Sequence, residues 1–213
     1  REGEAPHVLL FPEIAFDETA FLARVDAAVK RHGYCAIGVS EGLRTADGKF
    51  LSEGGLKDAF GHAQLGGVAP VIADLVQRRL GLKHHWAVAD YLQRSARHIA
   101  SRTDLEQSYA VGKAAVEMAV SGLSGVMPTI VRVSSRPYRW KIGKARLADV
   151  ANVERKMPRD HITPDGFHIT AKCRNYLSPL IAGEAFPPFE NGLPKYVRLA
   201  NRAVRKKTKA AAP

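Results

Sequence analysis

The sequence predicts an α/β fold built on a mostly parallel sheet, and three observations lead to it. Two apolar runs, 8–11 and 34–39, are separated by a helical pattern. A strand, a helix and a strand at this spacing form a βαβ unit, whose strands are parallel. Two further apolar runs, 86–89 and 126–132, alternate with longer helical patterns. Polar side chains follow the second and third runs, as is typical of strands that end at a binding site.

The four apolar runs are expected to be strands of one sheet. In such a sheet, the side chains that follow the second and third strands would face a common cleft, because ligands bind outside the carboxyl ends of the strands. Residues 42–58 are rich in glycine and are interpreted as an excursion from the sheet.

Helices are predicted from the apolar periodicity and from residues that favour helix ends. Asp17 is expected to cap the first helix, and Gly33 to end it. Gly81 is expected to end the second, and Asp165 to cap the last. The expected helices cover 17–33, 68–80, 104–120 and 165–176.

Composition bounds the class of protein. The chain has 213 residues and a formal net charge of +11, which permits anionic partners. Its two cysteines, Cys35 and Cys173, suggest no disulfide framework and favour a reducing cytoplasm. No apolar stretch reaches the roughly 18 residues of a membrane span. The chain starts at Arg1 without a methionine, which suggests the middle of a longer protein, although an engineered or processed start would look the same.

Glu41, Tyr91 and Arg94 are the first candidate site residues, because they follow the second and third predicted strands. A carboxylate accepts hydrogen bonds from sugar hydroxyls, and the planar guanidinium of arginine donates paired hydrogen bonds to phosphate oxygens. The set suits a sugar phosphate. The alternative is a helix cap or salt bridge for Glu41 and a surface turn for the other two.

Basic and glycine-rich segments give weaker candidates. Lys83, His84 and His85 precede the third predicted strand and could hold a phosphate or form a polar entrance to the strand. A metal site is not favoured, because the two histidines have no evident third ligand. Gly66 and Gly67 come just before a helix, where free amides favour anions, but the string 58–67 is neither a Walker loop nor a dinucleotide fingerprint. His62, in the same string, could be a general acid or base, but a hydrogen-bonded structural histidine is the favoured interpretation.

A basic middle raises nucleic-acid binding as an alternative class. Its cations surround Tyr138 and Trp140, yet no recognition helix, zinc finger or RNA-binding strand signature accompanies them, so nucleic acid is not favoured. The cations are Arg97, His98, Arg102, Arg132, Arg136, Arg139, Lys141 and Lys144.

Several strings together resemble one family, the phosphofructokinases, and in particular their pyrophosphate-dependent branch. Two of them are Ala36-Ile-Gly-Val-Ser-Glu-Gly42 and Tyr91-Leu-Gln-Arg94. The order and spacing of all the matching segments are specific, and the resemblance covers about 7–200. It implies a phosphofructokinase-like fold of three layers, α/β/α. The matching segments are 11–17, 36–42, 58–67, 91–94, 100–104, 121–127, 150–154 and 176–184.

The resemblance implies roles for the candidate residues. Glu41 falls on the family's glutamate that binds fructose 6-phosphate hydroxyls, and Tyr91 on a substrate-contacting position. Arg94 falls on an arginine that binds the sugar phosphate and stabilises charge on the transferred group. A basic residue for the 6-phosphate is common around Lys83 to His85, so both Lys83 and His85 are candidates.

The resemblance also implies what this sequence lacks. The family's glycine-rich donor loop, its catalytic aspartate and its Met-Gly-Arg substrate loop do not occur here. We therefore expect 1–200 to be the carboxyl-terminal half of a 6-phosphofructokinase, with 201–213 as a basic flexible tail, and we expect this chain to be inactive alone.

The family's reaction moves a phosphoryl group from pyrophosphate to the 1-hydroxyl of fructose 6-phosphate in glycolysis, with Mg²⁺ bridging donor oxygens. A cytoplasmic homodimer or homotetramer is implied. The alternatives are an ATP-dependent enzyme and a non-catalytic module that binds sugar phosphate or completes an oligomer.

Overall fold

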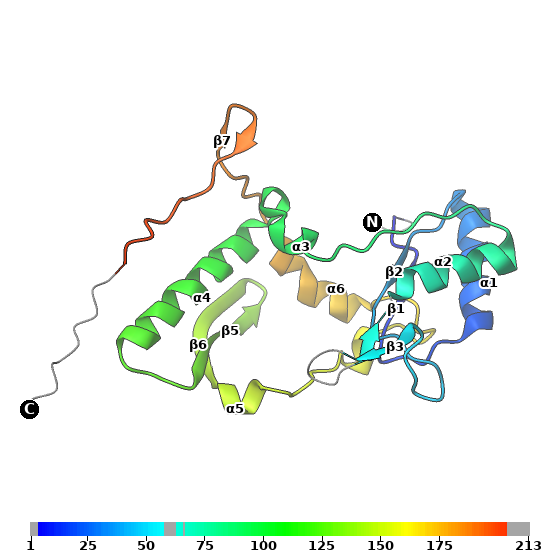
Figure 1. Ribbon diagram of the computed structural model, residues 1–213, viewed down its shortest axis with the longest axis horizontal. Helices are drawn as coiled ribbons and strands as arrows, with labels where there is room; N and C mark the ends of the chain where they lie inside the picture. Colours follow the sequence, from blue (N-terminus) through cyan, green and yellow to red (C-terminus); the bar gives the residue numbers. More distant parts are fainter. Residues whose placement is uncertain (1–3, 58–62, 66, 204–213) are drawn as a thin grey trace, which may run out of the picture.

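The chain forms two lobes in the computed structural model, which describes residues 4–57, 63–65 and 67–203 (Figure 1). The first lobe contains β1 (Val8–Leu10), α1 (Glu18–His32), β2 (Ile37–Val39), β3 (Glu53–Lys57), β4 (Ala63–Leu65) and α2 (Val68–Leu80). The second lobe contains α3 (Leu92–Ser95), α4 (Arg102–Val120), β5 (Val126–Ser135), β6 (Tyr138–Arg146), α5 (Leu147–Val150) and α6 (Ala171–Leu177). Short 3-10 helices lie at Arg97–Ile99 (η1), Arg159–His161 (η2) and Ser178–Ile181 (η3), and a small hairpin pairs β7 (Phe189–Glu190) with β8 (Leu193–Pro194).

The βαβ unit at the start of the chain is confirmed. Asp17 caps α1, since its carboxylate accepts a hydrogen bond from the Ala20 amide at 3.0 Å. Gly33 ends the helix in the left-handed conformation at φ 79°, where its amide donates to the Val29 carbonyl. The strands on either side, β1 and β2, pair in parallel as predicted, and the chain belongs to the α/β class.

Helix α2 completes the core of the first lobe. It ends at Gly81, which is left-handed at φ 65°, as the sequence predicts. Its apolar face packs against α1 and the β1–β2 pair, and Phe167 from much later in the chain joins them. The buried residues of this core are Val8, Leu10, Phe21, Val25, Leu43, Val68, Ile72 and Val76.

The prediction of one four-stranded sheet is wrong. In the described residues the strands form four separate pairs, and β5 pairs with β6 in antiparallel register rather than with β1 or β2. Only Arg136 and Pro137 separate the two strands, a connection that suits an antiparallel hairpin, whereas parallel strands need a crossover of about a dozen residues or more.

The predicted strand at 86–89 is also wrong. This part of the chain is extended but pairs with no strand among the described residues, and it belongs to the segment 82–90 that joins the two lobes (Figure 1). Trp86 and Val88 are exposed there. An apolar run becomes a strand only when a neighbouring strand satisfies its backbone groups, and none lies beside this one.

The segment 157–170 returns the chain to the first lobe. The Met157 amide donates to the Glu13 carboxylate at 2.8 Å, and the Leu9 amide donates to the Phe167 carbonyl at 2.8 Å. Helix α6 then leads back to the second lobe, where Arg132 donates to the Tyr176 carbonyl at 2.7 Å. These contacts tie the two lobes together.

The helix predicted from Asp165 begins later, at Ala171, and Thr170 caps it. Asp165 instead closes a turn, because its carboxylate accepts hydrogen bonds from the Thr163 hydroxyl at 2.5 Å and the Phe167 amide at 3.2 Å. This local use of an aspartate competes with helix capping.

The division of the chain at residue 200 stays a prediction. Residues 201–203 are exposed and have no regular structure, and the rest of the predicted tail lies outside the described residues.

Phe21 is the test of the first-lobe core. It is 0% exposed, so Phe21→Ala removes buried apolar contacts and leaves a cavity, and we expect it to lower the free energy of unfolding by about 3–5 kcal/mol. The matched control is Phe186→Ala, at a side chain that is 70% exposed, with an expected change within about 0.5 kcal/mol. Urea unfolding followed by circular dichroism measures both, and equal midpoints for the two variants would contradict the proposed core.

Asp165 should make stability depend on pH. Partial burial raises the pKa of its carboxyl group, but hydrogen bonds from Thr163 and Phe167 and the charge of Arg24 outweigh burial and lower the pKa overall. The carboxylate therefore stabilises the fold above its unfolded pKa of about 3.9, and this contribution is lost as pH falls through the lower folded value. We expect Asp165→Asn to reduce the melting temperature at pH 7, with the gap to the unmodified chain narrowing toward pH 3. A gap that widens on acidification would contradict this assignment.

Candidate functional site

Glu41 lies on a tight turn directly after β2, where the sequence places it. The Leu43 amide donates to the Ser40 carbonyl at 3.1 Å, and the Leu43 side chain is buried in the first-lobe core. Gly42 lies against Pro12, whose Cβ would be 3.2 Å from a Cβ added at the glycine. The backbone of the turn is therefore fixed, while the Glu41 side chain is exposed and makes no hydrogen bond or ion pair with the described residues.

Tyr91 and Arg94 lie at the start of the second lobe. Tyr91 is the N-cap residue of α3, a single helical turn that contains the backbone of Arg94. The Leu92 amide donates to the Ala89 carbonyl at 2.8 Å, and the Ser95 hydroxyl donates to the Tyr91 carbonyl at 3.1 Å. Tyr91 is exposed, and the Arg94 side chain lies outside the described part of the structure.

The α3 turn is anchored to the segment that follows η3. Arg97 donates a hydrogen bond to the Ala185 carbonyl, and the Arg102 amide donates to the Gly183 carbonyl at 2.9 Å. Gly183 has φ 77°, and a Cβ added there would lie 2.9 Å from the Arg102 Cβ. Only glycine fits this close approach, so residues 183–185 form a support for the turn that carries Tyr91 and Arg94.

Arg97 was missed as a positioning residue by sequence reasoning, which placed it among the cations of the basic middle. No local signal marks it, because its acceptor, Ala185, is 88 positions further along the chain.

Lys83 and His85 lie in the extended segment between the lobes. Both are exposed, and His84 between them is half-buried. The segment follows Gly81, which ends α2, and runs toward α3 (Figure 1). Two potential cations therefore lie on the stretch that connects the lobe of Glu41 to the lobe of Arg94.

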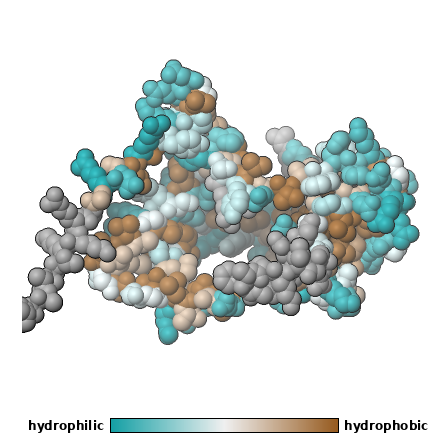
Figure 2. All heavy atoms as spheres, viewed as in Figure 1, coloured by the Kyte–Doolittle hydropathy of each residue, from teal (hydrophilic) through white to brown (hydrophobic). Residues whose placement is uncertain are grey.

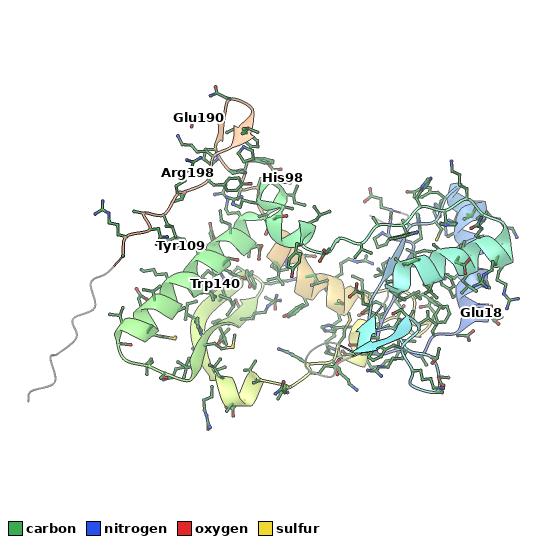
Figure 3. The ribbon with its side chains drawn as sticks, in the orientation of Figure 1. Glu18, His98, Tyr109, Trp140, Glu190 and Arg198 are labelled. Carbon is green, nitrogen blue, oxygen red and sulfur yellow. The ribbon has the colours of Figure 1, made fainter. Side chains whose placement is uncertain are left out.

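The structure does not bring all five predicted residues into contact. Glu41 belongs to the first lobe, Tyr91 and Arg94 belong to the second, and Glu41 makes no hydrogen bond or ion pair with the described residues of the second lobe. Figure 3 shows His98, just beyond α3, in the second lobe and Glu18 of α1 in the first lobe. A single site for Glu41, Tyr91, Arg94, Lys83 and His85 stays a prediction, and it would lie between the lobes.

The glycine-rich string gives no testable site here. His62 and Gly66 lie outside the described residues. Gly67 precedes α2 at φ 88° and serves as its N-cap residue. Strand β3 precedes the string and pairs in antiparallel register with β4, which lies within it; β3 pairs with neither strand of the parallel β1–β2 pair, in agreement with an excursion at 42–58.

The two cysteines are poor nucleophile candidates. Burial raises the pKa of the Cys35 thiol and of the Cys173 thiol, which keeps both protonated near neutral pH.

In the described ranges, no cluster of three or more histidine, cysteine or acidic side chains is arranged to bind a metal ion. Within the same ranges, no helix combines the length and apolarity that crossing a bilayer requires.

Comparison with known proteins identifies close relatives, although no family model matches the chain. It is 65% identical over 204 residues to pyrophosphate–fructose 6-phosphate 1-phosphotransferase of Methylococcus capsulatus, and 59% identical over 206 residues to the protein of that name from Halomonas elongata. The matches cover 96% and 97% of this chain and 49% of each relative. The chain thus spans about half the length of these relatives.

Solved structures give the same result. The crystal structure of pyrophosphate-dependent phosphofructokinase from Marinobacter aquaeolei is 55% identical, with a TM-score of 0.78 over 98% of this chain and 49% of that one. The enzyme from Nitrosospira multiformis is 57% identical, with the same TM-score over 97% of this chain and 48% of that one. The predicted phosphofructokinase-like fold is confirmed. The chain therefore belongs to the phosphofructokinase family, and it is most like the carboxyl-terminal half of a pyrophosphate-dependent member.

Proposed function

We propose that the chain is the fructose 6-phosphate-binding part of an enzyme that transfers a phosphoryl group from pyrophosphate to the 1-hydroxyl of fructose 6-phosphate, a step of glycolysis. One observation carries this proposal: the 65% identity over 204 residues to an enzyme named for that reaction. Because the chain spans 49% of that relative, the donor site and the catalytic base are proposed to come from the half that it does not match. A cytoplasmic homodimer or homotetramer is part of the same proposal.

Glu41 is proposed to orient the sugar. Its carboxylate accepts hydrogen bonds from two sugar hydroxyls, and its turn is held by Leu43 and by contact with Pro12. A fixed turn keeps the entropic cost of binding low, which is the usual benefit of preorganisation. In a phosphoryl transfer, such positioning supplies a large part of the rate enhancement.

Arg94 is proposed to stabilise charge on the transferring phosphoryl group. A guanidinium makes paired hydrogen bonds to phosphate oxygens, and these are stronger than hydrogen bonds between neutral groups. Tyr91, three positions earlier on the same turn, is proposed to contact the sugar phosphate, and Lys83 or His85 to neutralise the 6-phosphate. The contact between Arg97 and Ala185 supports this arrangement because it fixes the α3 turn.

Mg²⁺ is proposed to bind through the donor and the unmatched half of the enzyme. It would neutralise charge on the donor phosphates. Pyrophosphate rather than ATP is proposed as the phosphoryl donor, because the relatives at 55–65% identity are named pyrophosphate–fructose 6-phosphate 1-phosphotransferase.

The chain alone should show no turnover. We expect no fructose 1,6-bisphosphate from purified chain, Mg²⁺, fructose 6-phosphate and either pyrophosphate or ATP in a coupled assay. Calorimetry on the same sample should detect binding of fructose 6-phosphate. Clear turnover would contradict the proposal that the donor site and the catalytic base come from the unmatched half. Absence of both turnover and binding would remove the proposed sugar-phosphate site.

Arg94→Lys tests the proposed role of the guanidinium. Lysine keeps the charge but loses the planar fork, and charge-assisted hydrogen bonds are worth about 1.5–3 kcal/mol. In a full-length enzyme whose carboxyl-terminal half has this sequence, we expect kcat and kcat/KM to fall together by roughly tenfold to a hundredfold. A rise in KM with unchanged kcat would restrict Arg94 to substrate binding.

The matched control for Arg94 is Arg31→Lys, in the exposed last turn of α1. It makes the same chemical change far from the α3 turn, so kcat and KM should stay within about twofold of the unmodified enzyme, in line with the small effect of surface substitutions. Arg97→Lys is unsuitable as a control because Arg97 holds the Ala185 carbonyl. If Arg31→Lys harms the enzyme as much as Arg94→Lys, the role of Arg94 is rejected.

A further inference from the structure

Asp90, directly before the α3 turn, has a backbone conformation that is uncommon for any residue other than glycine. Its φ is 43°, and Tyr91 follows at φ -77° and ψ -9°. The Leu92 amide donates to the Ala89 carbonyl at 2.8 Å across these two residues. A positive φ at the first central residue, followed by a second residue near these angles, is typical of a type II′ turn, which prefers glycine at the first central position. The sequence has an aspartate there instead.

The other positive-φ positions outside glycine have a local explanation that Asp90 lacks. Among the described residues they are Asn152 at φ 59° and Asn191 at φ 51°. Asn191 and Gly192, which has φ 79°, form the two-residue turn of the β7–β8 hairpin, and such turns require positive φ at both positions. Asp90 instead lies at a corner, where the extended segment 82–90 gives way to a helical turn.

The side chain of Asp90 does not account for its conformation. An aspartate can stabilise a turn by accepting a hydrogen bond from the amide two residues on, as Asp165 does from Phe167. Asp90 is exposed, and its carboxylate makes no hydrogen bond or ion pair with the described residues. Packing does not account for the conformation either, because the neighbours Ala89 and Tyr91 are exposed as well. Figure 2 shows hydrophobic side chains spread over both lobes rather than gathered in a single patch.

Contacts that follow the turn hold it in place. Arg97 donates a hydrogen bond to the Ala185 carbonyl, and the Ser101 hydroxyl donates to the Leu180 carbonyl at 2.7 Å. The segment between α3 and α4 is thereby tied to residues 180–185. A backbone conformation that is rarely populated persists where its surroundings fix it, and such positions cluster at active sites. Asp90 immediately precedes two of the candidate site residues.

We propose that Asp90 is a positioning residue for the phosphoryl transfer: its positive-φ backbone, rather than its carboxylate, sets the course of the helical turn that carries Tyr91 and Arg94. The inference rests on the proposed function, in which these two residues contact the sugar phosphate. A change of φ at Asp90 redirects the chain that follows, because φ and ψ are the soft dihedrals of each residue. In a reaction that depends on placement, a shift of about 1 Å can cost roughly a hundredfold in rate.

Variants at Asp90 that differ in their tolerance of positive φ test the proposal, in the same full-length enzyme as Arg94→Lys. Asp90→Val should lower kcat roughly tenfold and raise KM for fructose 6-phosphate about threefold or more, since a β-branched side chain is strongly disfavoured at positive φ and both Tyr91 and Arg94 are displaced. Asp90→Gly and Asp90→Asn, which accept positive φ, should keep both constants within about twofold. Asp90→Ala should fall between these variants, and it replaces Asp90→Val if that variant does not fold.

Asn191→Val is the matched control. It introduces the same side chain at φ 51° in the β7–β8 turn, so it brings comparable backbone strain away from the α3 turn. It should lower the melting temperature about as much as Asp90→Val but leave kcat and KM within about twofold. Equal losses of activity in the two valine variants would overturn the proposal, because a general loss of stability would explain both. Equal losses in Asp90→Asn and Asp90→Val would also overturn it, because the carboxylate would then be the acting group.

A double variant shows whether Asp90 acts through Arg94. Residues that act on the same step are not additive, so Asp90→Val should reduce kcat/KM by a clearly smaller factor in an Arg94→Lys background than in the unmodified enzyme. Asn191→Val should have the same small effect in both backgrounds. Losses from Asp90→Val and Arg94→Lys that multiply in full would overturn the proposal.

Calorimetric binding of fructose 6-phosphate to the same enzymes separates this inference from the proposed reaction. If the unmodified enzyme binds the sugar phosphate without turnover, the proposed reaction is removed. The inference is then supported if Asp90→Val weakens binding about threefold or more while Asp90→Asn does not, and it is overturned if the two variants bind alike. Absence of both binding and turnover in the unmodified enzyme overturns the function and the inference together.

Discussion

The packing of α1 and α2 around Phe21, over the parallel β1–β2 pair, is the interaction on which the rest of the structure depends. Among the described residues, this packing forms a contiguous core of buried apolar side chains. It fixes the end of β2 and, through Leu43, the turn that presents Glu41. It also provides the surface to which 157–170 returns, so the path of the later chain is set by the same core. Loss of this core would displace the candidate carboxylate and the link between the lobes together.

The second lobe is held by polar contacts more than by burial. Arg132 lies over the rings of Tyr138 and Tyr176, with its guanidinium 4.9 Å and 4.1 Å from the ring centroids, and the Gln107 amide donates to the Tyr138 hydroxyl at 2.6 Å. These contacts join α4, the hairpin and α6 but bury little apolar surface. Cation–π and side-chain hydrogen bonds are worth about 1 kcal/mol each, whereas a fully buried aliphatic side chain contributes about 1.5–3 kcal/mol. The polar contacts of this lobe therefore join elements that keep many of their apolar side chains exposed.

The candidate site was predictable in its parts and not in its assembly. Glu41 follows a strand inside the βαβ unit, and both the strand and its position can be derived from a local apolar run and a helix with clear caps. The strand expected before Tyr91 and Arg94 does not form, although the run Trp86-Ala-Val-Ala89 is as apolar as many strands. The anchor of the α3 turn joins Arg97 to Ala185, 88 positions apart, and no local pattern reports such a contact. The relation between Glu41 and Arg94 across the lobes therefore stays a prediction.

The sequence by itself determined α1, α2 and α4, the first parallel strand pair and the family, because caps, periodicity and motif order are local or are shared with relatives. Asp17 caps α1, and Gly33 and Gly81 end α1 and α2, through contacts within their own segments, so these roles do not depend on distant parts of the chain. Only the tertiary structure decided how the later strands pair. The alternation of Tyr138, Trp140 and Ile142 with cations fits both a strand and a basic surface, and the two-residue turn that places it beside β5 makes it a strand. Strand pairing and the burial of an apolar face depend on residues far away in the sequence, so they follow from the assembled fold rather than from any one segment.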